Sequence, residues 1–258
     1  MLSLLPGSSV TVAFLLLSGF LAGCAVDAQT GEDQGALTAS DQELVRQCPP
    51  PAKPGFEILK PKGKYFGKRY EDWGSEWWRW ALETPASTHP IIDATGEFCG
   101  VNQTEPLFFL AGDFGGSVAR DCTVPRSKPV FFPLLNFFWD NCGVPPDEQT
   151  PNSEIIAELE NFSDSVTALT LKVDGVTIGS DPNDFTSYLG GVTKFSYVVP
   201  AEDSLYEYIG FDFAGRCAPS FQTGYYVLIS FERGKHEIEF SGTQADFSLD
   251  VKYTLTVK

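Results

Sequence analysis

Phe247-Ser-Leu-Asp-Val-Lys-Tyr-Thr-Leu-Thr-Val257 decides the fold class, because apolar and polar residues alternate along it without a break. Successive side chains of a β-strand point to opposite faces, so this stretch predicts a strand with one buried and one wet face. Further strands are expected at 106–111, 129–136, 168–173, 176–179, 195–199, 225–231 and 236–240. These runs are short, are separated by turn residues and lack βαβ spacing. The sequence therefore predicts a mainly β chain built as an antiparallel β-sandwich.

Residues 70–84 are the clearest helical segment, and a proline follows them directly. On a wheel of about 100° per residue, Trp73, Trp77 and Trp80 share one face, which predicts that these three rings lie in the core. A second, shorter helix is expected over 153–161. Both helices are predicted to pack on the sandwich.

The composition excludes several classes of protein. The chain has 258 residues, with 18 Lys+Arg against 34 Asp+Glu, and its formal net charge is −16. Its hydrophobic share of 43% argues against a disordered chain, and its acidity argues against a nucleic-acid partner. Only two histidines are present, and no Walker A, GxSxG or HExxH motif occurs, so no cofactor or metal is expected.

The N-terminus predicts export. Residues 1–23 carry no charge, and the apolar run at 10–21 is shorter than the roughly 20 residues of a membrane-spanning helix. Leu21-Ala22-Gly23-Cys24 resembles the lipobox of bacterial lipoproteins. The resemblance implies cleavage before Cys24, acylation of that cysteine and anchoring to a membrane through the acyl chains. Because Ala25 follows the cysteine, it also implies sorting to the outer membrane or cell surface.

These features divide the chain into a signal peptide (1–23), an acylated N-terminus with a flexible tether (24–69) and a β-sandwich domain (70–258). Six basic residues and one acid lie between Lys53 and Arg69, within an acidic chain. Two interpretations remain open for this basic strip. It is a solvated loop or a strip docked on the acidic domain, or it contacts anionic headgroups or acidic polymers of the cell envelope.

Two parts of the chain resemble known proteins. Residues 165–258 contain Gly224-Tyr-Tyr-Val-Leu, Gly234-Lys-His-Glu-Ile-Glu-Phe and the closing strand. These patterns resemble those of an immunoglobulin-like module. A jelly-roll-like sandwich is the alternative form. A second block consists of the Trp-rich helix, His89-Pro90-x-x-Asp93, Phe98-Cys99, Arg120-x-Cys122 and Phe131-Phe-Pro. This block resembles a family of secreted bacterial proteins with no settled activity. That resemblance implies a location and an architecture but no catalytic residues.

Once Cys24 is set aside, five cysteines remain, and in an exported protein they should oxidise. Cys99 and Cys122 flank one apolar strand and a Gly-rich turn, which predicts a bridge between them. Cys142 with Cys217 is the second predicted bridge. Cys48 is then the spare thiol.

The polar residues around the Trp-rich helix suggest one cluster of possible chemistry. His89 and Asp93, with Glu76 or Glu83, would make an acid/base pair or half of a metal site. The alternative is a structured loop, in which His89 caps the helix end and Asp93 begins a turn.

Three classes of function follow from the sequence. The leading one is a non-catalytic envelope protein that binds glycan, peptide or another envelope component. Trp78 and Trp139 are then the rings expected to be partly exposed and to stack on a sugar. The second is a carbohydrate-active hydrolase that uses carboxylates near the Trp cluster. The third is a purely structural lipoprotein.

Overall fold

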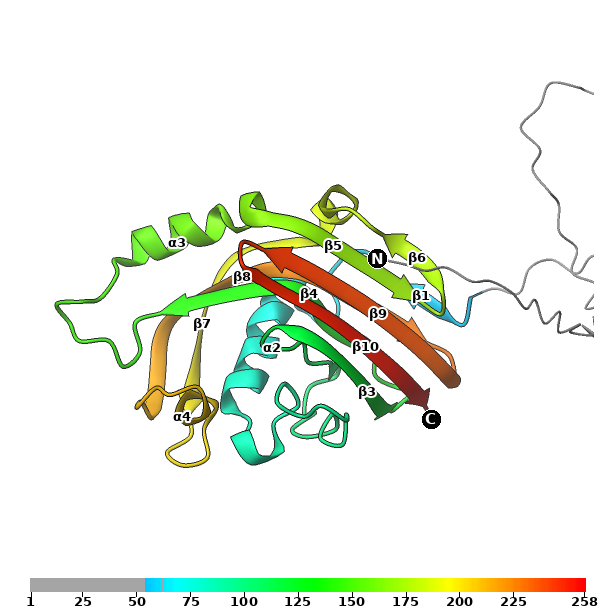
Figure 1. Ribbon diagram of the computed structural model, residues 1–258, viewed down its shortest axis with the longest axis horizontal. Helices are drawn as coiled ribbons and strands as arrows, with labels where there is room; N and C mark the ends of the chain where they lie inside the picture. The colour runs from blue at the N-terminus through cyan, green and yellow to red at the C-terminus, as the bar shows by residue number, and fades with distance from the viewer. Residues whose placement is uncertain (1–53, 62) are drawn as a thin grey trace, which may run out of the picture. The chain divides into compact units, whose positions relative to one another are not determined.

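The computed structural model of the protein (Figure 1) describes residues 54–61 and 63–258. Its strands are β1 (Phe56–Ile58), β2 (Phe108–Phe109), β3 (Gly116–Val124), β4 (Val130–Asp140), β5 (Val166–Val173), β6 (Val176–Gly179), β7 (Leu189–Val199), β8 (Gly215–Phe231), β9 (Gly234–Gln244) and β10 (Phe247–Val257). Its α-helices are α2 (Tyr70–Glu83), α3 (Asn152–Glu160) and α4 (Leu205–Tyr208), and short 3₁₀ turns lie at 86–88, 162–165 and 182–188.

The strands form two sheets. The first has the order β1-β8-β4-β2, and β7 also pairs with β8; the second has the order β3-β10-β9-β5-β6 and runs across the front of Figure 1. The expected mainly β class is confirmed. The sheets are mixed rather than wholly antiparallel, because β2 pairs with β4 and β3 pairs with β10 in parallel. Alternation of residue types predicts a strand and its faces but not the direction of its neighbour.

The two sheets share one core. Phe132 and Val227 of the first sheet lie in the same buried cluster as Phe240 and Tyr253 of the second, and the Phe132 and Phe240 ring centroids are 5.0 Å apart. At Gly242 the sheets approach so closely that a Cβ atom would lie 2.1 Å from Leu135 Cδ1. This face-to-face packing buries one side of each sheet.

Helix α2 covers the opposite face of the first sheet. Trp73, Trp77 and Trp80 are buried there, in one cluster with Phe131 and Tyr226, so the prediction that these rings are core is confirmed. Phe131 and Tyr226 neighbour Phe132 and Val227 in sequence and therefore point to the other side of the sheet. Helix α3 forms a separate small cluster through Ile155 and Leu159, which pack with Phe221 of β8.

The folded unit begins earlier than the predicted boundary at residue 70. Strand β1 pairs with the end of β8, and the Tyr70 hydroxyl donates to the carbonyl of Leu59. The described part of the expected tether therefore belongs to the compact unit of residues 54–258. The alternation over Phe56–Ile58 was too short to mark a strand in the sequence. No helix in the described ranges is long and apolar enough to cross a membrane.

Two residues of the basic strip between Lys53 and Arg69 are paired with acids of α2. Lys68 Nζ lies 2.5 Å from Glu76 Oε1, and Arg69 contacts both Glu71 and Asp72. For these two residues the geometry favours the interpretation in which the strip docks on the acidic domain.

Both predicted disulfides, Cys99–Cys122 and Cys142–Cys217, are present. Cys24 and Cys48 lie outside the described residues.

Candidate functional site: an apolar end cavity

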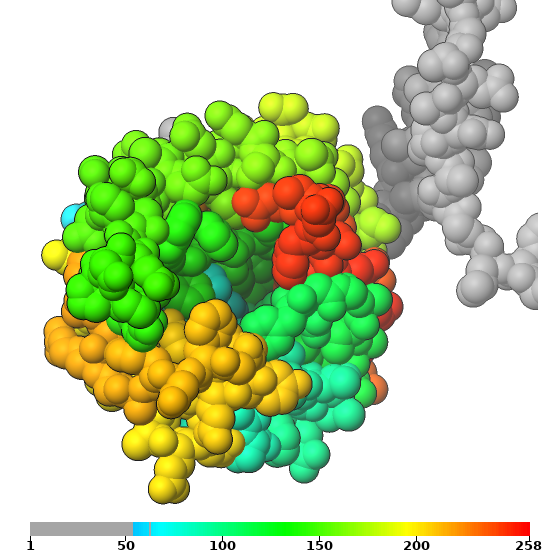
Figure 2. All heavy atoms as spheres, turned by 60° about the vertical axis from the view of Figure 1, so that its left-hand side comes forward, coloured from blue at the N-terminus to red at the C-terminus, as the bar shows by residue number. Residues whose placement is uncertain are grey.

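A cavity of about 340 Å³ opens beside the free edge of β4, where Figure 2 shows the molecule hollowed between its green, yellow and red segments. We call it the end cavity. It is lined by residues of α2, of the segment 112–114, of β4, of α4 and of the β9–β10 hairpin. Its volume falls at the lower end of the range of about 300–1,000 Å³ that is usual for small-molecule sites.

The sequence makes this cavity by leaving β4 without a second neighbour. Strand β2 pairs with β4 only at Val130 and Phe131, and beyond that point β8 is the strand partner of β4 in the described sheet. Pro133 has no N–H to donate, and the register of β4 against β8 shifts between Pro133 and Leu135. This irregularity places a bulge after Pro133, and the residues that follow it form a wall of the cavity.

The rim of the cavity is apolar and open to solvent. Phe114 is 50% exposed, Ile209 is 44% exposed, and Phe137 and Phe247 are also exposed. Tyr208 and Phe211, which flank Ile209, are exposed as well. Soluble proteins rarely expose several large apolar side chains together, and such a patch usually marks a binding surface.

The wall carries few polar groups, and two of them are engaged by the protein. Asp113 accepts from Arg120, and Gln244 donates to the hydroxyl of Ser165. The indole N–H of Trp78 and the amide nitrogen of Asn136 are buried without a hydrogen bond. Both of these groups lie near the Tyr226 hydroxyl, and burial raises the pKa of that phenol well above its ordinary value. The cavity therefore offers its occupant mainly apolar contact.

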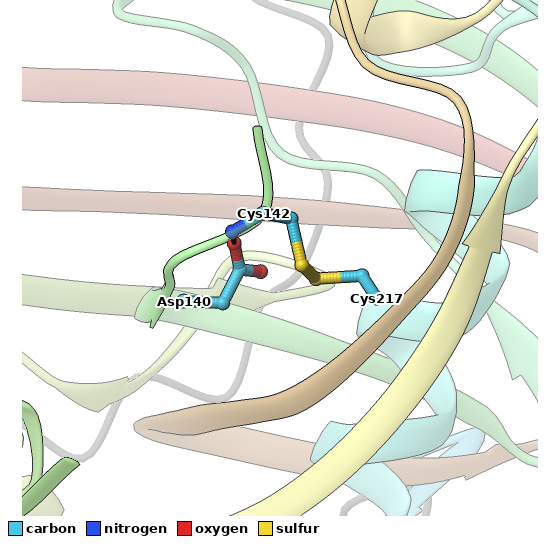
Figure 3. Close-up of side chains that lie close together, drawn as sticks. All are labelled: Asp140, Cys142 and Cys217. Carbon is cyan, nitrogen blue, oxygen red and sulfur yellow. Dashed lines mark hydrogen bonds between the residues drawn. A yellow bond between two sulfur atoms is a disulfide. The ribbon is translucent and has the colours of Figure 1, made fainter. Parts of the chain in front are cut away.

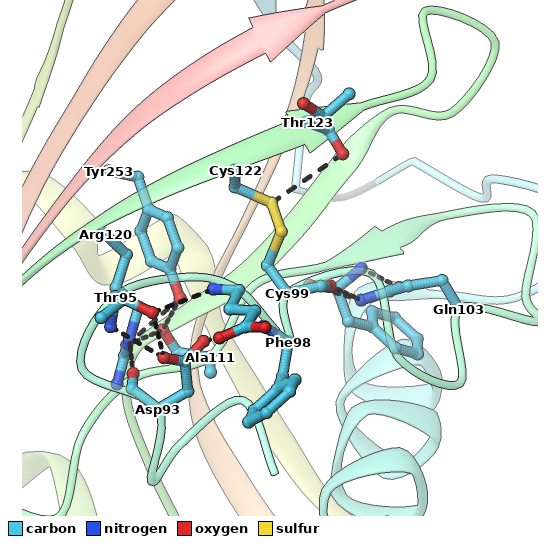
Figure 4. Close-up of a disulfide and its surroundings, with 12 residues drawn as sticks. Asp93, Thr95, Phe98, Cys99, Gln103, Ala111, Arg120, Cys122, Thr123 and Tyr253 are labelled. Carbon is cyan, nitrogen blue, oxygen red and sulfur yellow. Dashed lines mark hydrogen bonds between the residues drawn. A yellow bond between two sulfur atoms is a disulfide. The ribbon is translucent and has the colours of Figure 1, made fainter. Parts of the chain in front are cut away.

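Arg120 fixes one side of the cavity from within the protein (Figure 4). Its guanidinium is buried and donates to the carbonyl oxygens of Ile91 (2.9 Å), Asp93 (2.6 Å) and Gly112 (2.8 Å). It also donates to the Tyr253 hydroxyl on β10. One charged group thereby ties two lining segments to the second sheet.

A second buried network holds α4 in place (Figure 3 shows its acidic member). Asp140 accepts from the Tyr197 hydroxyl at 2.8 Å, and the Tyr197 and Tyr206 hydroxyls share a further hydrogen bond. Burial raises the pKa of Tyr206 to about 12, so the phenol stays protonated at neutral pH.

Asp140 also lies beside Cys142 and Cys217, a grouping that could hold a metal. Because the two sulfurs are bridged, they offer no thiolate ligands, and the arrangement is structural.

Two of the predicted acid/base residues, Glu76 and Glu83, are engaged by neighbouring groups of the protein. Glu76 is paired with Lys68 and Arg79, and although burial opposes this, the hydrogen bonds from these cations hold its pKa below the ordinary value. Glu83 accepts from the backbone N–H of Val198 at 2.8 Å. Glu76 and Glu83 both border a shallow pocket of about 250 Å³ on another side of α2.

His89 and Asp93 have structural partners instead. The N–H of Ile91 donates to Nδ1 of His89, so Nε2 carries the proton and donates to the carbonyl of Ala81 at 2.6 Å. Asp93 accepts from the backbone of Thr95 and Phe98, which outweighs burial and lowers its pKa. Both contacts match the structured-loop alternative, in which the histidine caps the end of α2.

The two candidate stacking rings lie in different places. Trp78 is half-buried in the wall of the end cavity, with its ring centroid 4.4 Å from that of Phe138. Trp139 is also half-buried but packs on the cluster of α3. They do not form one row on the surface.

Sequence reasoning missed the rim of the cavity. Phe114 lies in a Gly-rich turn, Phe247 follows the short segment Gln244-Ala-Asp246, and Ile209 directly follows α4. A large apolar residue placed in a turn, where it has no periodic partners, was the available signal.

Comparison of the chain with protein-family models, with curated proteins and with solved structures finds no match.

Proposed function

We propose that this protein is a non-catalytic binding protein of the bacterial cell envelope, which holds an apolar small molecule or acyl chain in the end cavity. The observation that carries the proposal is an apolar cavity whose exposed rim is also apolar. Removing such a ligand from water is favourable in proportion to the apolar area that is buried. A sugar would find few free hydrogen-bonding groups in this wall.

The envelope location rests on the lipobox-like Leu21-Ala22-Gly23-Cys24, and the proposal includes cleavage before Cys24 and anchoring through acyl chains. Mass spectrometry of the mature N-terminus tests this part. An unmodified terminus, or one at another residue, would contradict it. The proposal further takes the two packed sheets as a β-sandwich scaffold, supported by their shared core.

Binding is tested with N-phenyl-1-naphthylamine, an uncharged apolar dye that fluoresces when it leaves water. We expect saturable binding by the full-length protein and its loss in Gly112→Leu. Gly112 lines the cavity, and a Cβ added there would lie 3.9 Å from Leu249 Cδ2, so a leucine at 112 fills space that the dye needs. Gly100→Leu is the matched control, because Gly100 is exposed with nothing within 4 Å of an added Cβ.

The same experiment separates the candidate functions. Dye binding that is absent from the wild type, or that is equal in Gly112→Leu and Gly100→Leu, would reject the end cavity as the site. The structural class of lipoprotein would then be ahead. The hydrolase alternative gains nothing from the geometry of Glu76 and Glu83, which are occupied by cations and backbone.

A further inference from the structure

A tight turn just before α2 presents a phenylalanine to solvent. Tyr65 and Lys68 exchange two backbone hydrogen bonds, of 2.9 Å and 3.1 Å, so Phe66 and Gly67 form a two-residue hairpin loop. Both residues have positive φ, 51° at Phe66 and 84° at Gly67. Gly, Asn and Asp are the usual residues in such a loop, because a bulky side chain is strained there. The chain nevertheless carries a large ring at this tip, and the ring is 58% exposed.

Contacts with α2 hold this turn in place. The indole N–H of Trp73 donates to the carbonyl of Tyr65 at 2.9 Å, and the Lys68 ammonium lies 4.7 Å from the centroid of the Trp73 ring. Trp73 is itself buried against the first sheet. Phe66 meets it edge-on, with ring centroids 6.5 Å apart. The exposed ring is therefore carried by a braced turn rather than by an isolated loop.

Two lysines beside the turn have no acid partner among the described residues. Lys60 and Lys64 are both exposed, and the Tyr65 hydroxyl donates to the carbonyl of Lys60 at 3.2 Å. The acids at the start of α2 are already paired with other residues of the basic strip. Burial opposes ionisation of Asp72, and Arg69 with Lys64 nearby lowers its pKa, yet Lys64 lies beyond ion-pair distance of that carboxyl. An exposed ring is thus flanked by two uncompensated cations.

This combination matches the surface of an anionic bilayer. Lysines near such a surface are attracted by the headgroups, and an aromatic ring gains by entering the headgroup–acyl boundary, about 5–10 Å deep. An acidic polymer would attract the lysines but would offer the ring no apolar surroundings. The net charge of −16 does not prevent the contact, because charges farther away than about 8 Å are largely screened at physiological salt.

We propose that the turn at Phe66, with Lys60 and Lys64, docks the folded domain on anionic phospholipids. The inference goes beyond the proposed function, because it concerns a surface other than the end cavity. It uses the proposed acylation of Cys24 only as a tether. A chain of about 30 residues joins Cys24 to Pro54 and spans at most about 100 Å, so the anchored domain meets the membrane at a high local concentration.

Hydroxyl-radical footprinting of the full-length protein tests the site, because it reads the exposure of individual phenylalanine rings. The vesicles are phosphatidylcholine alone or phosphatidylcholine mixed with phosphatidylglycerol, and sedimentation collects the bound protein. We expect oxidation of Phe66 to be lost on the anionic vesicles at low salt and to return at high salt. On the neutral vesicles it should stay near its value in solution. Phe211, which is 59% exposed and packs beside α4, is the internal reference and should stay accessible on both.

Removal of the two positive charges is the second arm of the test. In Lys60→Gln with Lys64→Gln, the ratio of protected to accessible Phe66 should fall about fivefold for each lysine, since one basic residue near anionic headgroups contributes about 1 kcal/mol. Lys172→Gln with Lys194→Gln is the matched control, because it makes the same change in net charge at exposed positions of β5 and β7. It should keep the protection. Circular dichroism verifies that each variant is folded.

The outcomes separate this inference from the proposed function. If Phe66 oxidises as fast on anionic vesicles as in solution, or if the protein does not sediment with them, the docking site is overturned. Equal protection on both kinds of vesicle, or in both lysine variants, also overturns it, since the lysines would then play no part. Equal protection by poly-L-glutamate without vesicles would assign the strip to acidic polymers instead. Dye binding by the end cavity is measured separately and stands or fails by itself.

Discussion

At position 74 the helix α2 and the strand β8 leave no room for a side chain. A Cβ added to Gly74 would lie 2.5 Å from Cζ of Tyr226, whose ring is fully buried. Gly190 has a similar role beneath the same helix, since a Cβ there would lie 3.1 Å from Cβ of Glu71. Single hydrogen atoms in place of side chains thus set the distance between the helix and the first sheet.

Gly74→Ala should therefore destabilise the protein, although alanine favours a helix by about 1 kcal/mol over glycine. We expect a net loss of about 1–3 kcal/mol in the free energy of unfolding, which is the usual cost of overpacking a core. Urea denaturation measures it. Gly100→Ala, in open space, is the control. A more stable Gly74→Ala variant would show that α2 shifts to accept the methyl group.

A second residue-scale prediction concerns pH. Burial lowers the pKa of His89, and the Ile91 N–H that points at Nδ1 leaves no room for a second proton. The unfolded chain takes up that proton near pH 6.5, so the folded state is favoured above this pH and loses stability as the pH falls. The free energy of unfolding should rise between about pH 5 and about pH 7.

His89→Gln should flatten this rise, whatever its effect on absolute stability. Denaturant titrations of both proteins across the pH window measure the slope. Asp93 and Glu76, whose pKa values are lowered, act in a more acidic window and lose their contribution only as the pH falls through those lowered values. An equal slope in the variant would assign the effect to another group.

At the scale of elements, the two disulfides constrain very different lengths of chain. Cys99 and Cys122 are 23 residues apart and join the loop before β2 to β3. Cys142 and Cys217 are 75 residues apart and join the loop after β4 to β8. Both bridges flank segments that position the end cavity, because Cys122 lies two residues from Arg120 and Cys217 packs in one cluster with Leu205 and Tyr206.

Removing the longer bridge should cost more. The chain-entropy relation gives about 4.5 kcal/mol for a closed loop of 75 residues and about 3.4 kcal/mol for one of 23. Guanidinium denaturation of the variants Cys142→Ala with Cys217→Ala and Cys99→Ala with Cys122→Ala makes the comparison. A larger loss in the second variant would mean that packing around Cys99 and Cys122, rather than loop length, decides the cost.

The elements differ in how well the sequence predicts them. Helix α2 and strand β10 follow almost directly from apolar periodicity. Strand β3 does not follow from apolar periodicity, because its inward residues include Arg120 and Cys122. The burial of these two residues depends on partners elsewhere in the chain. The seventeen-residue β8 was recognised only over 225–231, since its first half buries Ser220 and Gln222. Gln222 donates to the carbonyl of Glu71, and no local pattern reveals that contact.

At the scale of the whole molecule, the mainly β class and the two bridges were predictable, whereas the cavity was not. Its lining comes from six separate segments, which are brought together by the packing of the two sheets, α2 and α4. The partners of Glu76 and Glu83 were not predictable either, since proximity in sequence to the Trp cluster does not fix the contacts of a side chain. Trp78 and Trp139 are both half-buried, but Trp78 lines the cavity whereas Trp139 packs on the cluster of α3.

The compact unit predicts a stable fragment. A chain that begins at Pro54 should unfold cooperatively at the same temperature as the full chain, whereas one that begins at Lys60 should melt several degrees lower because it lacks β1. A loss of about 1 kcal/mol shifts the melting temperature of a protein of this size by about 2–4 °C. Differential scanning calorimetry compares them. Equal melting temperatures for both fragments would show that β1 contributes little.

The parallel pairing of β3 with β10 has a consequence for the time the chain needs to fold. Arg120 and Tyr253, which face each other across these strands, are 133 residues apart in the sequence. In the described sheet β10 is the strand neighbour of β3, so β3 stays unpaired until the β9–β10 hairpin has been synthesised. Folding rates fall as the sequence separation of contacts grows. The edge of β3 is therefore expected to stay unpaired for longer than strands whose partners follow them closely in the sequence.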